Sequence, residues 1–239
     1  MVPAWLHTTA LLSLAAGFVI AFWIGVDEWR RPQRMWIMNL VWPITALFGT
    51  FITLVGYLLY GRQPAKSDTK ESDDRPKEEI PFPVMVAKGA THCGSGCTIG
   101  DLLAEWLAFS VPAVAVWLGW NTLFEEKMFA VWILDFLFAF AIGVAFQYFT
   151  IKPMRQLSVR QGLIQAVKAD ALSLSAWQIG MYAFMAFAQF QIFRGLLGVP
   201  LEVATPEFWF MMQIAMLFGF ITSYPVNWWL MSKAIKERM

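Results

Sequence analysis

Residues 91–105, THCGSGCTIGDLLAE, contain both cysteines of the chain and one of its two histidines. Four side chains with ligand chemistry recur at every fourth position: Cys93, Cys97, Asp101 and Glu105. In a helix each such step rotates by only about 40°, so all four would share one face. The small residues Gly96, Gly100, Ala104 and Ala108 would form a neighbouring stripe that lets another helix approach closely. The stretch therefore predicts a helix whose polar face is turned toward protein.

The rest of the chain is too apolar for a soluble protein. Its 239 residues are 58% hydrophobic and 15% charged, which leaves more apolar surface than a soluble core of this size could hide. Six continuous runs are long enough to cross about 30 Å of hydrocarbon as helices. They are Ala4 to Val26, Trp36 to Tyr60, Gly100 to Trp120, Met128 to Thr150, Ala171 to Phe193 and Phe208 to Met231. We predict an all-α, polytopic membrane bundle with six transmembrane helices in the lipid bilayer of a bacterial inner membrane.

The basic residues predict the orientation of this bundle. Thirteen of the eighteen Lys and Arg residues lie in segments that would face inward if the N-terminus were inside. The positive-inside bias then places both termini in the cytoplasm. Arg30, Arg31 and Arg34 oppose this orientation because they closely follow the first run.

Composition divides the chain into three parts. Residues 1–60 would form two membrane helices, residues 61–88 a flexible charged linker, and residues 89–239 a four-helix membrane domain entered through the His/Cys motif. The net charge is only +1 and the basic residues lie at membrane edges, so no nucleic-acid partner is expected. The oligomeric state is left open.

Three interpretations of the cysteines remain open. If residues 94–96 form a loop, His92 could join Cys93 and Cys97 around a soft metal ion such as Cu(I), with zinc as the alternative. The two thiols could instead cycle through a disulfide, although their spacing is one residue wider than C-x-x-C. As packing residues, they and their glycines would only allow close helix contact.

Other polar and sulfur-containing residues within the apolar runs could line a path through the bundle. Buried carboxylates and amides are costly in hydrocarbon, and thioethers suit Cu(I). The candidates are Asp135, Asp170, Gln178, Met181, Met185, Met212 and Met216. The alternative is that the amides bond neighbouring helices and the methionines pack. Near the end of the chain, Pro225 should kink the helix beside Asn227, and Lys233 and Lys236 are expected to be interfacial anchors.

Three segments together resemble the domain-of-unknown-function family 4396 of bacterial membrane proteins, over about residues 89–239. They are His92-Cys93-x-x-Gly96-Cys97-x-x-Gly100-Asp101, then Phe146-Gln147-Tyr148 with Lys152-Pro153-Met154, and last Met212-Gln213 through Gly219-Phe220 to Tyr224-Pro225-Val226-Asn227. Some members are associated in genome annotation with copper oxidases, so the resemblance points toward copper.

The predicted function is that of an integral membrane protein that binds a soft metal ion, above all copper, at His92, Cys93 and Cys97, and could transport it. Asp101 and Glu105 would be additional ligands or proton-coupled relay groups. A membrane thiol oxidoreductase or quinone-linked redox protein is one alternative, and a structural or assembly subunit is the other. The sequence contains no signature of a conventional enzyme class, and no catalytic residue is assigned.

Overall fold

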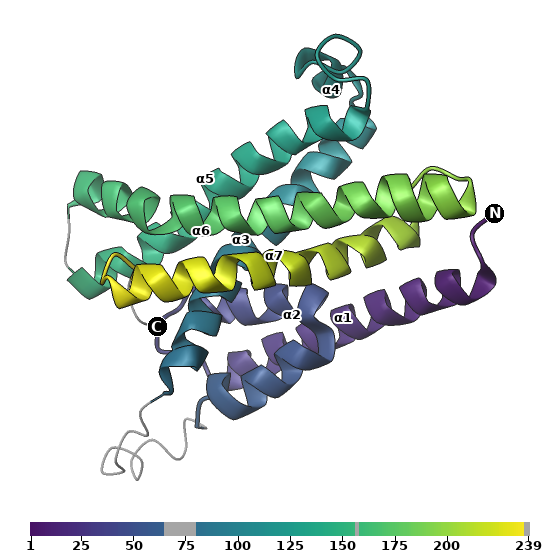
Figure 1. Cartoon of the computed structure of the whole chain (residues 1–239). Helices are drawn as coiled ribbons and strands as arrows, with labels where there is room; N and C mark the ends of the chain where they lie inside the picture. The colour runs from purple at the N-terminus through teal and green to yellow at the C-terminus, as the bar shows by residue number, and fades with distance from the viewer. Residues whose placement is uncertain (65–79, 156–157, 237–239) are drawn as a thin grey trace.

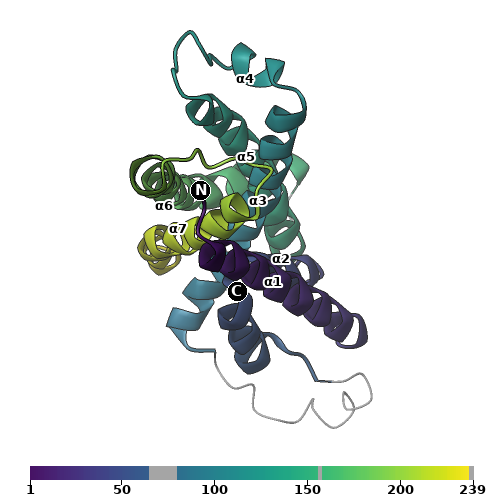
Figure 2. The same cartoon turned by 90° about the vertical axis from the view of Figure 1, so that its right-hand side faces the viewer.

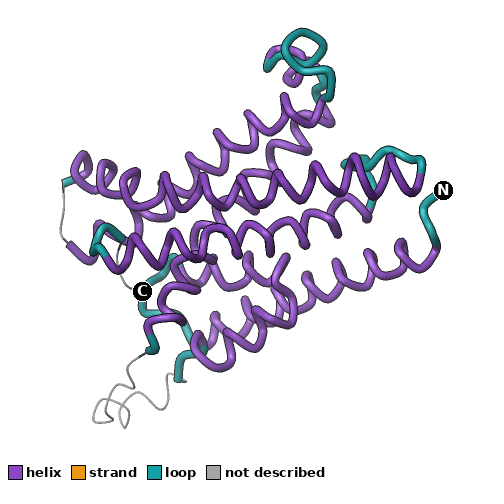
Figure 3. The backbone as a smooth tube through the Cα atoms, viewed as in Figure 1, coloured by secondary structure: helices purple, strands orange, loops and turns teal. Residues whose placement is uncertain are grey.

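The computed structural model describes residues 1–64, 80–155 and 158–236, and the regular elements in these ranges are helices (Figure 3). The α-helices are α1 (Ala4–Arg30), α2 (Met38–Gly56), α3 (Phe82–Ser110), α4 (Ala113–Trp117), α5 (Lys127–Arg155), α6 (Val159–Phe187) and α7 (Pro206–Ser232) (Figure 1). Two π-helical segments, Tyr57–Gly61 and Ala188–Leu197, continue α2 and α6. The all-α prediction is confirmed for the described residues.

Five of the described helices are long and apolar enough to cross a membrane. They are Ala4–Arg30, Met38–Gly61, Lys127–Ile151, Val159–Leu197 and Pro206–Ser232. The remaining predicted span, Gly100 to Trp120, is wrong as a single helix, because α3 ends at Ser110 and Pro112 begins the short α4. A proline disfavours helical geometry in the residue before it, and Val111 has φ −128° and ψ 79°.

Helix α3 occupies the middle of the bundle. It begins at Phe82, inside the segment predicted as linker, and residues 65–79 of that segment lie outside the described residues. Its backbone lies close to that of α5, where a Cβ at Gly96 would lie only 2.9 Å from Gly143 Cα. The small-residue stripe therefore allows close helix packing, as the sequence predicted.

Helix α2 does not run straight through the bundle but folds back on itself. Thr50 has φ 41° and ψ −117°, which no helix can accommodate, and the chain reverses there. Consequently Trp42 packs edge-on against Tyr57, with ring centroids 5.5 Å apart, and Thr53 Oγ1 donates a hydrogen bond to Thr45 O. We call α2 and its π-helical continuation the α2 hairpin. Its two arms appear as antiparallel segments in Figure 1.

The bundle has two ends, and the chain termini lie at opposite ones (Figure 1). Figure 2 looks along the bundle with the N-terminus toward the viewer. At the N-terminal end His7 bonds to Glu207, which joins the starts of α1 and α7. At the C-terminal end Tyr224 donates to Pro83 O, which joins the end of α7 to the start of α3. The first arm of the α2 hairpin begins at Met38, shortly after α1 ends at Arg30, and the second arm returns to the last residues of α1, since Tyr57 donates to Asp27 at 2.9 Å. Helices α1, α3, α5, α6 and α7 connect the two ends.

Candidate functional site

The polar face of α3 forms as a helix and not as a loop. Helical geometry continues through residues 94–96. Position 94 must be a glycine there, because the ring of Trp177 fills the space that a side chain would need. The four predicted residues Cys93, Cys97, Asp101 and Glu105 are all buried. The predicted polar face is therefore turned into the protein from Cys93 to Glu105, and Glu105 lies two helical turns after Cys97.

Cys93 lies in a cluster of polar side chains from α3, α6 and the chain end. Its Sγ is 2.6 Å from Asp170 Oδ1, 3.1 Å from Ser173 Oγ and 2.9 Å from Lys236 Nζ. Asn227 completes the group by donating to Ser173 Oγ at 2.6 Å and accepting from Lys236 Nζ at 2.8 Å. We call these five residues the lysine cluster.

Lys236 is the charged centre of this cluster. Its side chain is fully buried, with 0% exposure. Burial lowers the pKa of an amine, but the neighbouring Cys93 and Asp170 outweigh that effect, so the pKa of Lys236 lies above its usual value. The expectation of an interfacial anchor is wrong for Lys236.

His92 does not join the two cysteines. It is buried on another side of α3, where its Nε2 is 3.0 Å from Thr150 Oγ1 and its ring packs against Phe146. Within the described residues, no group of three or more His, Cys, Asp or Glu side chains could hold a metal ion. The arrangement of these donor atoms does not fit a copper or zinc site with His92, Cys93 and Cys97 as its three ligands. Metal binding by the protein stays a prediction from the sequence. Both cysteines are free thiols.

Three carboxyl groups lie together farther along the bundle: Asp101 and Glu105 from α3, and Asp135 from α5. We call them the acidic trio. All are buried, and Asp135 interacts electrostatically with both of the others. Gln178 of α6 donates to Asp101 Oδ1 at 3.2 Å. Asp101 Oδ2 and both carboxyl oxygens of Asp135 have no hydrogen-bond partner.

A cavity of about 430 Å³ extends from Glu105, one member of the acidic trio, to the N-terminal end of the bundle. Glu105 is part of its wall, as are Gln189 and Lys127. Glu126 and Arg194 also line it and form an ion pair, which lowers the pKa of Glu126. A second cavity, of about 260 Å³, reaches Asp101 from the tip of the α2 hairpin.

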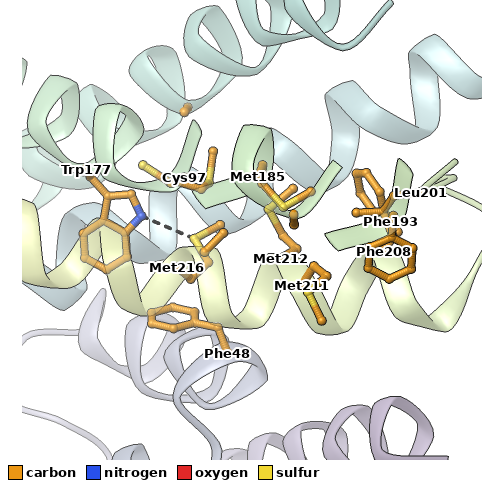
Figure 4. Close-up of a cluster of buried hydrophobic side chains, with 14 of the residues drawn as sticks. Phe48, Cys97, Trp177, Met185, Phe193, Leu201, Phe208, Met211, Met212 and Met216 are labelled. Carbon is orange, nitrogen blue, oxygen red and sulfur yellow. Dashed lines mark hydrogen bonds between the residues drawn. The ribbon is translucent and has the colours of Figure 1, made fainter. Parts of the chain in front are cut away.

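The predicted methionine path lies in the hydrophobic core. Met181, Met185, Met212 and Met216 are buried in one cluster with Trp177, Phe193 and Phe208. Figure 4 labels these residues except Met181. Met216 Sδ accepts a hydrogen bond from Trp177 Nε1 at 3.3 Å. These contacts account for the methionines as packing residues, and a role in transport stays a prediction.

Sequence reasoning missed part of the lysine cluster. Ser173 gave no signal, and Lys236 was assigned to the membrane surface. Asn227 stood beside the Pro225 break in a run of hydroxyl and amide groups, which was the one available indication. Only the folded chain reveals that Lys236 contacts Cys93 and that Asn227 contacts Lys236.

The fold and the site define a class of protein: a helical bundle with membrane-length helices packed around a polar central helix. The chain belongs to the family described as Domain of unknown function (DUF4396), whose family model matches residues 84–236. No curated protein and no solved structure matches it. The match confirms the family resemblance. It covers the chain from the first turn of α3 to Lys236 and does not include α1 or the α2 hairpin.

Proposed function

We propose that the protein is an integral membrane protein whose acidic trio carries protons across the bilayer. The observation that carries the proposal is the pair of unpartnered Asp135 oxygens, fully buried beside Asp101 and Glu105. A carboxylate at membrane depth needs a proton, a cation or a partner. Since the carboxyl groups are not grouped tightly enough to hold a metal ion, protons are the better occupants.

The cavity at the N-terminal end supports an entry route for these protons. It reaches Glu105, and its mouth carries the charged residues Glu126 and Arg194. On the other side of the trio, Gln178 links Asp101 to α6. Asp170 lies two helical turns before Gln178 on the same helix and belongs to the lysine cluster, so polar groups continue toward the C-terminal end.

The arrangement of the helices supports five crossings and one re-entrant segment in place of six crossings. Helices α1, α3, α5, α6 and α7 would cross, and the α2 hairpin would enter and leave at the C-terminal end. Helix α3 is not among the spans identified by mean hydropathy, but its polar residues Asp101 and Glu105 are buried among neighbouring helices, as lipid requires.

The charge distribution supports placing the C-terminal end in the cytoplasm of a bacterial inner membrane. Among Lys and Arg residues of the described chain, Lys127 and Arg194 belong to the N-terminal end. The others belong to the opposite end or to the helix segments nearest it. Arg30, Arg31 and Arg34 then agree with the positive-inside rule, and the N-terminus lies outside.

Proton movement can be measured in proteoliposomes that contain a pH-sensitive dye, with an imposed potential as the driving force. We expect the wild-type protein to acidify the lumen, and Asp135→Asn to slow this by about tenfold or more, because the relay loses a titrating group. Glu125→Gln is the matched control, since Glu125 is exposed. Wild-type flux equal to that of empty vesicles, or an unaffected Asp135→Asn variant, would refute the proposal.

A further inference from the structure

The end of the chain turns back into the bundle after α7. The helix ends at Ser232, and Ala234 then adopts φ 53° in the left-handed region. This backbone is unfavourable for a residue with a side chain, and it persists only where surrounding contacts fix it. The turn directs the Lys236 side chain inward, and the backbone N–H of Lys236 donates a hydrogen bond to Leu230 O.

Four acceptor atoms surround the Lys236 ammonium group. Asn227 Oδ1 is at 2.8 Å, Cys93 Sγ at 2.9 Å, Gly89 O at 3.2 Å and Asp170 Oδ1 at 3.5 Å. They come from α3, α6 and α7, so the site is built by the bundle and not by the tail that fills it. A lysine ammonium has only three N–H groups to offer.

The second oxygen of the same Asp170 carboxyl group has no partner. Asp170 Oδ2 is buried and makes no hydrogen bond, although Asp170 is fully enclosed. A free ammonium ion carries four N–H groups and has no stem, so it could use this oxygen as well. The site contains one carboxyl group and otherwise thiol, amide and carbonyl acceptors, which suits a single positive charge better than two.

We propose that the lysine cluster is a binding site for ammonium, and that Lys236 is a tethered occupant that closes it. When residues 233–236 swing away, ammonium binds to the acceptors that Lys236 leaves, and the returning lysine expels it. The inference stands apart from the proton path, because binding at equilibrium requires no flux.

The test removes the tethered group and supplies a free one. Purified Lys236→Ala protein is heated in ammonium chloride, with sodium chloride as the salt control and tetramethylammonium chloride as a cation without N–H groups. We expect ammonium to raise the melting temperature of Lys236→Ala in a saturable manner, because a ligand that binds the folded state stabilises it. The wild type should respond much less, since its site is filled. A stabilisation of the same size in potassium chloride would overturn the assignment to ammonium, because K⁺ has no N–H groups to donate.

A second measurement covers the case in which Lys236→Ala does not survive purification. In membranes, the alkylation rate of Cys93 in a Cys97→Ser background reports whether the site is covered. Lys236→Ala should speed alkylation, and ammonium should slow it again in that variant alone. Adding Asp170→Asn should abolish both ammonium effects. Equal effects of ammonium on wild type and Lys236→Ala, or none on either, would overturn the inference.

Discussion

Gly100 determines how closely α3 and α5 approach each other. A Cβ at this position would collide with the backbone of Ala139 and lie 2.9 Å from the carbonyl carbon of Phe138. Backbone atoms cannot move aside as a flexible side chain can, so the helices would have to separate. That separation would also move Asp135, one turn away on α5, relative to Asp101 on α3.

Replacing Gly100 with alanine should therefore destabilise the protein by about 1–3 kcal/mol, the usual cost of overpacking. Thermal unfolding in detergent measures the change. The matched control is Gly25→Ala in α1, where the added Cβ would meet only Pro43 Cγ at 4.0 Å. This control should be neutral or stabilising by up to about 1 kcal/mol, because alanine favours a helix. Equal stability of the two variants would contradict the close contact.

At the scale of elements, the α2 hairpin depends on a polar anchor at its tip. Gln213 of α7 donates to Leu47 O at 2.6 Å and accepts from Ser13 of α1 at 2.7 Å. One amide thus connects three elements next to the reversal at Thr50. The hairpin tip also forms part of the cavity that reaches Asp101, so its position affects access to the acidic trio.

Gln213→Leu should loosen the hairpin tip, since Leu47 O would lose its donor at a cost of about 1–3 kcal/mol. Hydrogen–deuterium exchange should rise in the peptide that spans Leu47 and Thr50. Ser13→Ala provides the comparison, because it removes only the second hydrogen bond and leaves Gln213 on Leu47. Similar exchange at the tip in Gln213→Leu and wild type would show that apolar packing alone holds the hairpin.

At the scale of the whole molecule, the sequence predicts the features that depend on local patterns, and it misses those that depend on contacts between residues distant in the chain. The i, i+4 spacing from Cys93 placed the polar face of α3, because helix periodicity is a local property. The reversal at Thr50 left no signal, since it occurs within an uninterrupted apolar run. The sequence predicts the span of α3 too far along the chain, at Gly100 to Trp120, because the first half of the helix has low hydropathy. Neighbouring helices bury the polar residues of that half. Lys236 was missed because its acceptors lie on helices distant in sequence.

The reversal of α2 changes the side on which the first loop lies, and this gives the most decisive prediction for the topology. With five crossings, Arg34 faces the cytoplasm together with Lys233, whereas six crossings would place Arg34 outside with Asn121. All three residues are exposed in the structure, so a cysteine at any of them is accessible on its own side. The basic residues at Arg34 and Lys233 favour the cytoplasmic side.

A membrane-impermeant maleimide applied to intact cells should therefore label Asn121→Cys and not Arg34→Cys or Lys233→Cys. Permeabilised cells should show labelling of all three variants. The single cysteines are placed in a Cys93→Ser, Cys97→Ser background, and this background without an added cysteine serves as the blank. Labelling of Arg34→Cys in intact cells, at the level of Asn121→Cys, would mean that α1 starts inside and that the α2 segment crosses the bilayer. The acidic trio would remain buried in either case, so this result would revise the topology without affecting the proton measurement.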